Sequence, residues 1–464
     1  MESMDGDGLN GKTVVVMGLG RFGGGLDSAQ FAAGRGARVI VTDMAAADKL
    51  ADSVAELEAT CRGMDLEFHL GSHEPRDFER ADLVIANPAV PADNRFLQIA
   101  RRAGVRVTSQ IALFFASCPA PIVGITGANG KSTTTALTAH LLRCARRGGD
   151  VGYGEVWLGG NIGNEPLLTI LDRVRPDDVV VLEVSSFQIE QLAAEGLAPH
   201  VALLTNLTAN HLDRYGTFEA YCAAKAPMFA LQRPRGDCPA VSLFNRDDEV
   251  ARAWFEKYRA DAGRICRLFC AADVSEGIRA EYRLPGRAYL ANLAGAMAIG
   301  RVFGVSDEAV VGCLGEFRGL SHRLELVEEV GGVRWYNDSK ATTPLSAMVA
   351  LEAFDAPVVI IAGGYDKHIA FDEFGSAIAG RAKAAILIGQ TASAIEAAIK
   401  TAAGRTVIQQ AGSLDEAVNT AGRLAEPGDV VLLSPACASY DMFENFEKRG
   451  EEFARCVRRL GGET

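Results

Sequence analysis

Short apolar runs alternate with longer amphipathic stretches along almost the whole chain, and this alternation is the feature that most restricts its fold. Runs of Val, Ile and Leu bounded by Gly, Asp and Pro are typical of strands buried on both faces of a parallel sheet. Intervening stretches such as Ser132–Arg146 have helical spacing, so the pattern predicts an α/β fold with largely parallel sheets. The predicted strands are Thr13–Met17, Arg38–Thr42, Leu83–Ala86, Pro121–Ile125, Val179–Leu182, Val201–Leu204, Val241–Phe244, Val333–Tyr336, Val358–Ala362, Ala385–Ile388 and Val430–Leu433.

The length of 464 residues favours about three domains. One candidate boundary precedes the strand Pro121–Ile125, at the Cys118-Pro119-Ala120-Pro121 segment. The other falls near Gly315–Ser321, where a Gly-containing turn follows a helical stretch and a new set of strands begins.

The net charge of −12 argues against general attraction to nucleic acid or to an anionic membrane. The ten cysteines include no CxxC pair, and the closest spacing, Cys266 and Cys270, matches no common zinc pattern. We therefore expect reduced, mostly buried thiols without a disulfide or metal role. The segment Met1–Asn10 has no apolar signal core, and no apolar run approaches the ~20 residues that span a bilayer. These features predict a cytoplasmic protein without membrane insertion.

The first glycine motif, Gly18-Leu19-Gly20-Arg21-Phe22-Gly23, lies between a predicted strand and a helical stretch, and Asp43 closes the next strand. Glycines in this pattern allow a tight turn and the approach of a pyrophosphate to a helix N-terminus. Taken alone, the motif favours NAD or FAD, and a purely structural glycine turn stays open as the alternative.

The second glycine motif, Thr126-Gly127-Ala128-Asn129-Gly130-Lys131-Ser132-Thr133, also follows a strand and begins a helix. Backbone N–H groups of such a loop bind phosphates, Lys131 neutralises β/γ-phosphate charge and the Ser132 hydroxyl suits Mg²⁺. It is not a strict Walker A sequence, because Ile125 stands at the usual first glycine. A chance Gly-Lys-Ser turn is the alternative, but the flanking strand and the Thr-rich helix start favour ATP.

Two further motifs follow strands. Glu183-Val184-Ser185-Ser186-Phe187-Gln188 places a carboxylate at the carboxyl end of a strand, where parallel sheets bind ligands, so Glu183 could hold the Mg²⁺ that Ser132 touches. Asn206-Leu207-Thr208-Ala209-Asn210-His211-Leu212-Asp213-Arg214 places His211 on the same rim, in a predicted metal or substrate role. The alternatives are a helix-start carboxylate and a structural histidine. Lys225, at the end of Tyr221-Cys222-Ala223-Ala224-Lys225, could face this cleft or lie on the surface.

The order and spacing of these motifs resemble the Mur ligases, which are ATP-dependent amide ligases of peptidoglycan synthesis. The resemblance extends from about Lys12 to Leu460 and favours the branch that adds D-glutamate. The C-terminal motifs that carry it are Gly319-Leu320-Ser321-His322-Arg323-Leu324-Glu325, Asn337-Asp338-Ser339-Lys340-Ala341-Thr342, Gly363-Gly364-Tyr365-Asp366-Lys367, Ser434-Pro435-Ala436-Cys437-Ala438-Ser439 and Phe446-Glu447-Lys448-Arg449-Gly450.

The resemblance implies three domains. Residues 1–111 would form an N-terminal Rossmann-like domain that binds the UDP part of the substrate, so the first glycine motif would hold a uridine nucleotide instead of NAD. Residues 112–319 would form a central P-loop domain with a parallel sheet that binds ATP. Residues 320–464 would form a C-terminal Rossmann-like domain that brings the amino acid.

The implied reaction joins D-glutamate to UDP-N-acetylmuramoyl-L-alanine. The alanine carboxylate attacks the γ-phosphate of ATP and gives an acyl phosphate and ADP, and the D-glutamate amine then attacks the carbonyl and expels phosphate. Because a carboxylate must approach a triphosphate, cations are required, and these would be Lys131 and two Mg²⁺ ions. By resemblance, Ser132 and Glu183 hold one ion, whereas His211 and Lys225 serve the second, with Lys225 carrying CO₂ as a carbamate.

The resemblance also assigns residues to each substrate, and its catalytic set is Lys131, Glu183, His211 and Lys225. ATP would contact Gly127, Ala128, Asn129, Gly130, Lys131, Ser132, Thr133, Asn292, Arg323 and Asp338. The UDP substrate would contact Gly20, Arg21, Phe22, Asp43, Asn161, Ser185 and His211. D-glutamate would contact Lys340, Thr342, Lys367, Ser439 and Phe446, with Lys367 opposite the side-chain carboxylate.

Three segments depart from the family pattern. Gly286-Arg287-Ala288-Tyr289-Leu290-Ala291-Asn292 keeps only the first glycine and the last asparagine of Gly-x-His-Asn-x-x-Asn. Asn87-Pro88-Ala89 replaces Ser-Pro-Gly, and Phe22 replaces a small hydroxyl residue. The nearest alternative is another amide ligase of the superfamily, with a different amino acid or a folate substrate. A nicotinamide-dependent dehydrogenase would leave the ATP loop unexplained. We expect a monomer.

Overall fold

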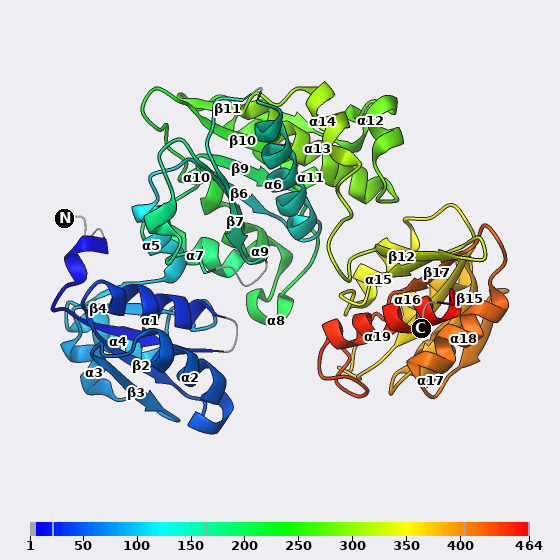
Figure 1. The fold of residues 1–464 in the computed structure, drawn as a ribbon, viewed down its shortest axis with the longest axis horizontal. Coiled ribbons are helices and arrows are strands. Elements are labelled where there is room, and N and C mark those ends of the chain that lie inside the picture. Colours follow the sequence, from blue (N-terminus) through cyan, green and yellow to red (C-terminus); the bar gives the residue numbers. More distant parts are fainter. Residues whose placement is uncertain (1–5, 21–22, 150, 163–165, 403, 463–464) are drawn as a thin grey trace. The chain divides into compact units, whose positions relative to one another are not determined.

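The computed structural model describes residues 6–20, 23–149, 151–162, 166–402 and 404–462. Strands and helices alternate along it, and the strands form three separate sheets (Figure 1). This arrangement confirms the predicted α/β class.

The first sheet has five parallel strands in the order β3-β2-β1-β4-β5. Along β1, Val14 and Val16 face one apolar cluster whereas Val15 and Met17 face another, so the sheet is buried on both faces. The strands are β1 (Thr13–Met17), β2 (Arg38–Asp43), β3 (Leu66–Leu70), β4 (Leu83–Ala86) and β5 (Arg106–Thr108), and the helices are α1 (Gly24–Gly34), α2 (Ala51–Thr60), α3 (Pro75–Arg80), α4 (Arg95–Arg102) and α5 (Gln110–Ser117).

The second sheet has six parallel strands in the order β11-β10-β9-β6-β8-β7. Its strands are β6 (Ile122–Thr126), β7 (Val156–Gly160), β8 (Val179–Glu183), β9 (Val201–Leu204), β10 (Ala240–Asn245) and β11 (Arg264–Phe269). The following helices are α6 (Lys131–Gly148), α7 (Ser186–Ala194), α8 (Leu212–Tyr215), α9 (Phe218–Lys225), α10 (Pro227–Ala230), α11 (Glu249–Tyr258), α12 (Glu276–Glu281), α13 (Arg287–Val302) and α14 (Asp307–Leu314).

The third sheet has the order β12-β13-β17-β14-β15-β16, and only the edge pair β12–β13 is antiparallel. Two apolar clusters cover its two faces. The strands are β12 (Glu325–Val330), β13 (Val333–Asn337), β14 (Val358–Gly363), β15 (Ala382–Ile388), β16 (Val407–Gln410) and β17 (Val430–Leu433), and the helices are α15 (Pro344–Leu351), α16 (Asp372–Arg381), α17 (Ala392–Thr401), α18 (Leu414–Leu424) and α19 (Phe446–Leu460).

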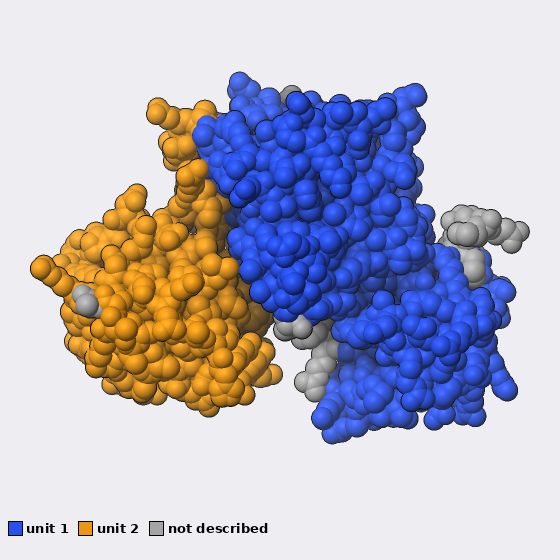
Figure 2. Space-filling model, turned by 180° about the vertical axis from the view of Figure 1, so that it is seen from behind, with its two compact units in different colours: residues 1–273, 291–313 blue, residues 274–290, 314–464 orange. Residues whose placement is uncertain are grey.

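The chain forms two compact units, residues 1–273 with 291–313 and residues 274–290 with 314–464 (Figure 2). The first unit holds the first two sheets, which share one apolar cluster. The buried Asp27 of α1 also links them, because its carboxylate accepts hydrogen bonds from the backbone of Leu168 (2.8 Å) and Thr169 (3.0 Å). The second unit holds the third sheet. The domain boundaries at 111/112 and 319/320 stay a prediction.

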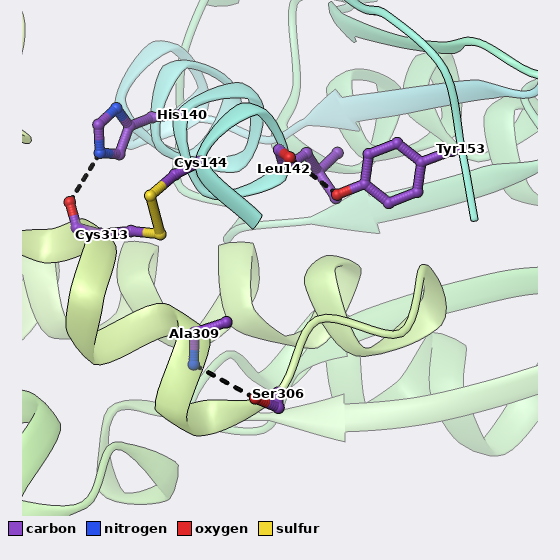
Figure 3. The surroundings of a disulfide bond; sticks show 7 residues. All are labelled: His140, Leu142, Cys144, Tyr153, Ser306, Ala309 and Cys313. Carbon is purple, nitrogen blue, oxygen red and sulfur yellow. Dashed lines mark hydrogen bonds between the residues drawn. A yellow bond between two sulfur atoms is a disulfide. The ribbon is translucent and has the colours of Figure 1, made fainter. Parts of the chain in front are cut away.

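The prediction that all ten cysteines are free is wrong. Cys144 of α6 and Cys313 of α14 form a disulfide, with their Cα atoms 5.9 Å apart (Figure 3). The two cysteines are 169 residues apart in the sequence, and rules based on short cysteine spacings cannot predict such a pair. His140, one turn before Cys144, donates from Nε2 to the Cys313 carbonyl (2.8 Å), which also joins the two helices. The free cysteines are Cys61, Cys118, Cys222, Cys238, Cys266, Cys270, Cys437 and Cys456.

We also examined whether any helix is long and apolar enough to cross a membrane. Among the described residues, no helix combines the length and the apolar character that crossing a bilayer would need.

Candidate active site

The loop between β6 and α6 has the backbone that a phosphate-binding loop requires. Gly127 and Gly130 have φ values of 149° and 78°, where side chains are disfavoured. A Cβ on Gly127 would overlap the Thr205 hydroxyl, and one on Gly130 would overlap the Asn292 side chain. Both positions therefore need glycine, and Asn292 lies against the loop despite the altered motif around it.

Two residues that follow β9 hold this loop. Asn206 accepts from the backbone N–H groups of Ala128 (2.8 Å, through its carbonyl) and Asn129 (2.9 Å, through Oδ1). Its Nδ2 donates to the Asn129 carbonyl (3.0 Å), to which Thr205 also donates from Oγ1 (2.7 Å). Sequence reasoning gave neither Thr205 nor Asn206 a role. The available signal was their place directly after a strand that pairs with β6.

The first turn of α6 begins with Lys131, followed by the buried Ser132 and Thr133. Lys131 donates from Nζ to the Ala128 carbonyl at 2.9 Å, so its charge lies over the loop. A helix N-terminus already favours anions through its unpaired N–H groups and its dipole. The loop, the helix start and the ammonium group together form a site suited to polyphosphate.

Glu183 ends β8, which pairs directly with β6, and it is buried. Its Oε1 accepts from Asn161 Nδ2 (3.2 Å), whereas Oε2 is buried and has no hydrogen-bond partner in the described part of the chain. An unsatisfied carboxylate oxygen beside a phosphate loop is the donor that a hard cation takes. Across the described residues, no group of three or more His, Cys, Asp or Glu side chains is arranged to hold a metal.

Lys225, in the last turn of α9, is 1% exposed, so the surface alternative is wrong. Its Nζ donates to Thr126 Oγ1 (3.1 Å) and lies 4.9 Å from the centre of the Tyr221 ring. Burial and, to a smaller extent, the nearby charge of Lys131 together lower the pKa of Lys225 to about 7. Thr126 and Tyr221 thus position this lysine at the base of the loop, a role that the sequence did not reveal.

His211 is exposed and precedes α8 with a φ of 52°. Its ring lies 5.4 Å from the Phe187 ring and 6.2 Å from the Tyr221 ring. Since Lys225 also contacts Tyr221, the structure brings His211 and Lys225 to the same aromatic group.

The residues predicted for the UDP substrate are only partly described. Gly20 donates its backbone N–H to Asp43 Oδ2 (3.2 Å), so the glycine turn and the end of β2 adjoin. Arg21 and Phe22 lie outside the described residues. Ser185 caps α7 in a capping box with Gln188, an arrangement that occupies its hydroxyl. A substrate contact of Ser185 stays a prediction.

In the second unit, Asp338 follows β13 and is buried. Burial raises its pKa to about 7, although hydrogen bonds from Ser434 Oγ (2.8 Å) and the Leu324 N–H (3.2 Å) and the charge of Arg323 oppose the rise. Arg323 and Asp338, both predicted to contact ATP, therefore interact electrostatically.

The five residues predicted for D-glutamate all belong to the second unit and follow neighbouring strands. Lys340 and Thr342 come after β13, Ser439 after β17 and Lys367 after β14, and these three strands are adjacent in the sheet. Phe446 begins α19, and Lys340 Nζ lies 5.2 Å from its ring centre. Lys367 is exposed. Ser439 Oγ is buried without a hydrogen-bond partner among the described residues, which suits a ligand-binding hydroxyl.

Three family profiles match the chain in order. Residues 12–109 match the Mur ligase MurD-like N-terminal domain, residues 125–273 the Mur ligase middle domain, and residues 322–437 the glutamate ligase domain of Mur ligases. They follow the order of the three sheets, and the predicted fold of three α/β domains is confirmed.

Curated relatives match almost the full length. A UDP-N-acetylmuramoylalanine–D-glutamate ligase of Roseiflexus sp. (strain RS-1) is 39% identical, over 97% of this chain and 99% of the relative. The ligase of the same name from Pelotomaculum thermopropionicum is 38% identical, over 97% and 98%. Among solved structures, a MurF ligase of Thermotoga maritima in complex with ADP has a TM-score of 0.57 at 17% identity, over 97% of this chain and 96% of that one. The UDP-N-acetylmuramate–alanine ligase of the same organism has a TM-score of 0.55 at 18% identity, over 97% and 99%. These two structures support the fold alone.

Proposed function

This chain belongs to the Mur ligase family, and we propose that it joins D-glutamate to UDP-N-acetylmuramoyl-L-alanine with ATP, giving ADP and phosphate, in the synthesis of a peptidoglycan precursor. The observation that carries this proposal is the near-complete match to ligases of that name, at up to 39% identity. The phosphate loop, with Lys131 over it and Glu183 and Lys225 beside it, gives the match a chemical basis.

ATP would bind with its phosphates in the loop from Gly127 to Thr133. Asn292 packs against Gly130 and is proposed to meet the nucleotide on that side, with Arg323 and Asp338 as further contacts. The Lys131 ammonium would offset the charge that builds up as the alanine carboxylate approaches the γ-phosphate. The product of this step is an acyl phosphate, a far better acyl donor than the carboxylate.

Two Mg²⁺ ions are proposed to bind beside the phosphate loop. The unsatisfied Oε2 of Glu183 and the Ser132 hydroxyl would hold one, and His211 with Lys225 would serve the other. The ions would supply charge neutralisation between the carboxylate and the triphosphate.

Lys225 is proposed to carry CO₂ as a carbamate. Its burial and its hydrogen bond to Thr126 hold the amine in place, and the pKa of about 7 leaves a large neutral fraction that can add CO₂. The carbamate oxygens would then suit a hard cation, which an ammonium group would repel.

The UDP substrate would lie against the turn at Gly20 and Asp43, with Asn161 and Ser185 nearer the reacting carboxylate. D-glutamate would lie among Lys340, Thr342, Ser439 and Phe446. Lys367 would pair with its side-chain carboxylate, and the buried hydroxyl of Ser439 would donate to the ligand. We place the reaction in the cytoplasm, where ATP is available, and propose that the protein acts as a monomer.

Phosphate release from ATP in the presence of UDP-N-acetylmuramoyl-L-alanine tests the proposal, with D-Glu, L-Glu, L-Lys and L-Ala as separate acceptors. We expect turnover with D-Glu alone, and a loss of at least ~100-fold in a folded Lys131→Ala variant, because such a charge contact stabilises the transition state by ~3 kcal/mol. Turnover with L-Lys or L-Ala instead would favour another amide ligase, and substantial acyl-phosphate formation by Lys131→Ala would contradict the assigned loop.

A further inference from the structure

Arg449 lies in the first turn of α19 and is 1% exposed. Its guanidinium bonds two loops at once. In the loop after β13, Nε donates to Ser339 Oγ (2.9 Å) and Nη2 to the Ser339 carbonyl (2.8 Å). In the loop after β17, Nη2 donates to the Cys437 carbonyl (3.0 Å) and Nη1 to the Ala438 carbonyl (3.2 Å). The planar group therefore fixes the spacing between these loops.

Each anchored loop carries residues proposed to contact D-glutamate. Ser339 directly precedes Lys340, and Ala438 directly precedes Ser439. Ser339 also donates from Oγ to the Phe446 carbonyl at 2.8 Å, so the start of α19 joins the same network.

The loop after β14 is tied to the same point. The Tyr365 N–H donates to the Ala438 carbonyl at 2.9 Å. Gly364 has a φ of 149°, and a Cβ there would overlap the Ala438 carbonyl and lie 3.2 Å from Arg449 Nη1. The loop that carries Lys367 therefore lies against the guanidinium and is bonded to Ala438, so Arg449 holds two of the three loops directly and the third through Ala438.

Among the described residues, no carboxylate lies within ion-pair distance of Arg449. Its hydrogen bonds go to three backbone carbonyls and one hydroxyl. Burial lowers the pKa of Arg449 to about 10, and electrostatic interactions with Cys437 and Asp441 oppose this shift. Burying a cation among neutral partners is unfavourable. A nearby anionic ligand would compensate it, and D-glutamate has two carboxylates.

We propose that Arg449 is a positioning residue for D-glutamate. It sets the spacing of the three loops that hold the amino acid, and its charge makes the electrostatic potential near these loops more positive. The inference rests on the proposed function. The alternative is that Arg449 only stabilises the fold of the second unit. Its loss would then change the KM of every substrate and not the KM of D-glutamate alone.

Full-length Arg449→Ala and Arg449→Lys are compared with the unchanged protein in the phosphate-release assay. We expect the KM for D-glutamate to rise at least 10-fold in both, with the KM for ATP changed less than 3-fold. Lysine fails because its ammonium cannot bond two loops in the fork geometry of arginine. Guanidinium at a few tens of millimolar should lower the KM of Arg449→Ala again, whereas the same concentration of NaCl should not. Arg455→Ala, an exposed arginine on the same helix, is the matched control.

Equal increases in every KM, or no rescue by guanidinium, would overturn the positioning role. If Arg449→Ala does not fold, Ser339→Ala tests the same network, since it removes the acceptor of Nε while keeping the charge; an unchanged KM for D-glutamate there would also overturn it. Failure of the unchanged protein to use D-glutamate would instead contradict the proposed function.

Discussion

A free ammonium group beside Mg²⁺ and a triphosphate would repel the cation that it is proposed to help bind. Lys225 avoids this conflict only if its charge changes. It is buried, hydrogen-bonded to Thr126 and has a pKa lowered to about 7 by burial and by Lys131. Near neutral pH much of the amine is therefore unprotonated and can form a carbamate, which adds oxygen ligands for a hard cation.

We expect Lys225→Ala to be nearly inactive in phosphate release, and acetate to restore part of the activity by occupying the position of the carbamate. The measurement is the rate across an acetate series at constant ionic strength. Lys257→Ala is the matched control, because Lys257 also lies over a tyrosine ring, 5.1 Å from the centre of Tyr258, but is exposed. A Lys225→Ala variant with full activity would contradict the carbamate proposal.

Lys367 is exposed, so its charge would lose water only when D-glutamate binds. We expect Lys367→Ala to raise the KM for D-glutamate by at least ~10-fold, which corresponds to about 1.4 kcal/mol, while the KM for ATP stays nearly constant. Initial rates over both substrate ranges measure the two values. Lys400→Ala, an exposed lysine of α17, should change neither. Equal effects of Lys367→Ala on both substrates would indicate a general structural role.

At the scale of elements, the sequence pattern predicted the central strands of each sheet but not its edge strands. All eleven predicted strands are present among the described residues, and the other six strands, β3, β5, β7, β11, β12 and β16, are the two edges of each sheet. Central strands such as β8 are buried at every position, whereas β16 is exposed at three of four positions. An edge strand is covered on fewer sides and keeps polar residues, so it lacks the continuous apolar run.

The same reasoning explains which site residues could be predicted. Glycine loops and polar residues directly after central strands point to the ligand edge of a parallel sheet, so Lys131 and Glu183 could be predicted from local pattern, whereas Ser439 was assigned by the family resemblance alone. Asn206 and Arg449 act by bonding backbone groups that are distant in sequence. No local pattern encodes such a contact, because it exists only once the sheet has formed.

The disulfide between α6 and α14 closes a loop of 169 residues, and such a link stabilises a protein by about 2–4 kcal/mol. We expect a reductant to lower the denaturation midpoint of the unchanged protein, and Cys144→Ser to have that lower midpoint with or without reductant. Cys238→Ser, which changes an exposed free cysteine, should leave the response to reductant intact. If reductant has no effect and mass analysis finds two free thiols at these positions, the pair is not a disulfide in solution.

At the scale of the whole molecule, two units with separate sheets and cores make up the chain. Proteins of this kind generally do not unfold in one two-state step. Two thermal transitions are therefore the expectation, one for the unit that holds the first two sheets and one for the unit that holds the third.

A ligand that binds one folded unit stabilises that unit alone, by about 2.7 kcal/mol at 100 times its Kd. The residues proposed for the UDP substrate, including Gly20, Asp43 and Asn161, all lie in the first unit. Since each kcal/mol shifts the Tm of a domain this large by roughly 2–4 °C, saturating UDP should raise one transition by roughly 5–11 °C and leave the other in place. Differential scanning calorimetry measures both, with adenosine as the nucleoside control. In a variant with Trp157→Phe and Trp254→Phe, the fluorescence of the remaining Trp335 identifies the transition of the second unit. A shift of both transitions, or of the second unit's transition alone, would contradict a uridine site confined to the first unit.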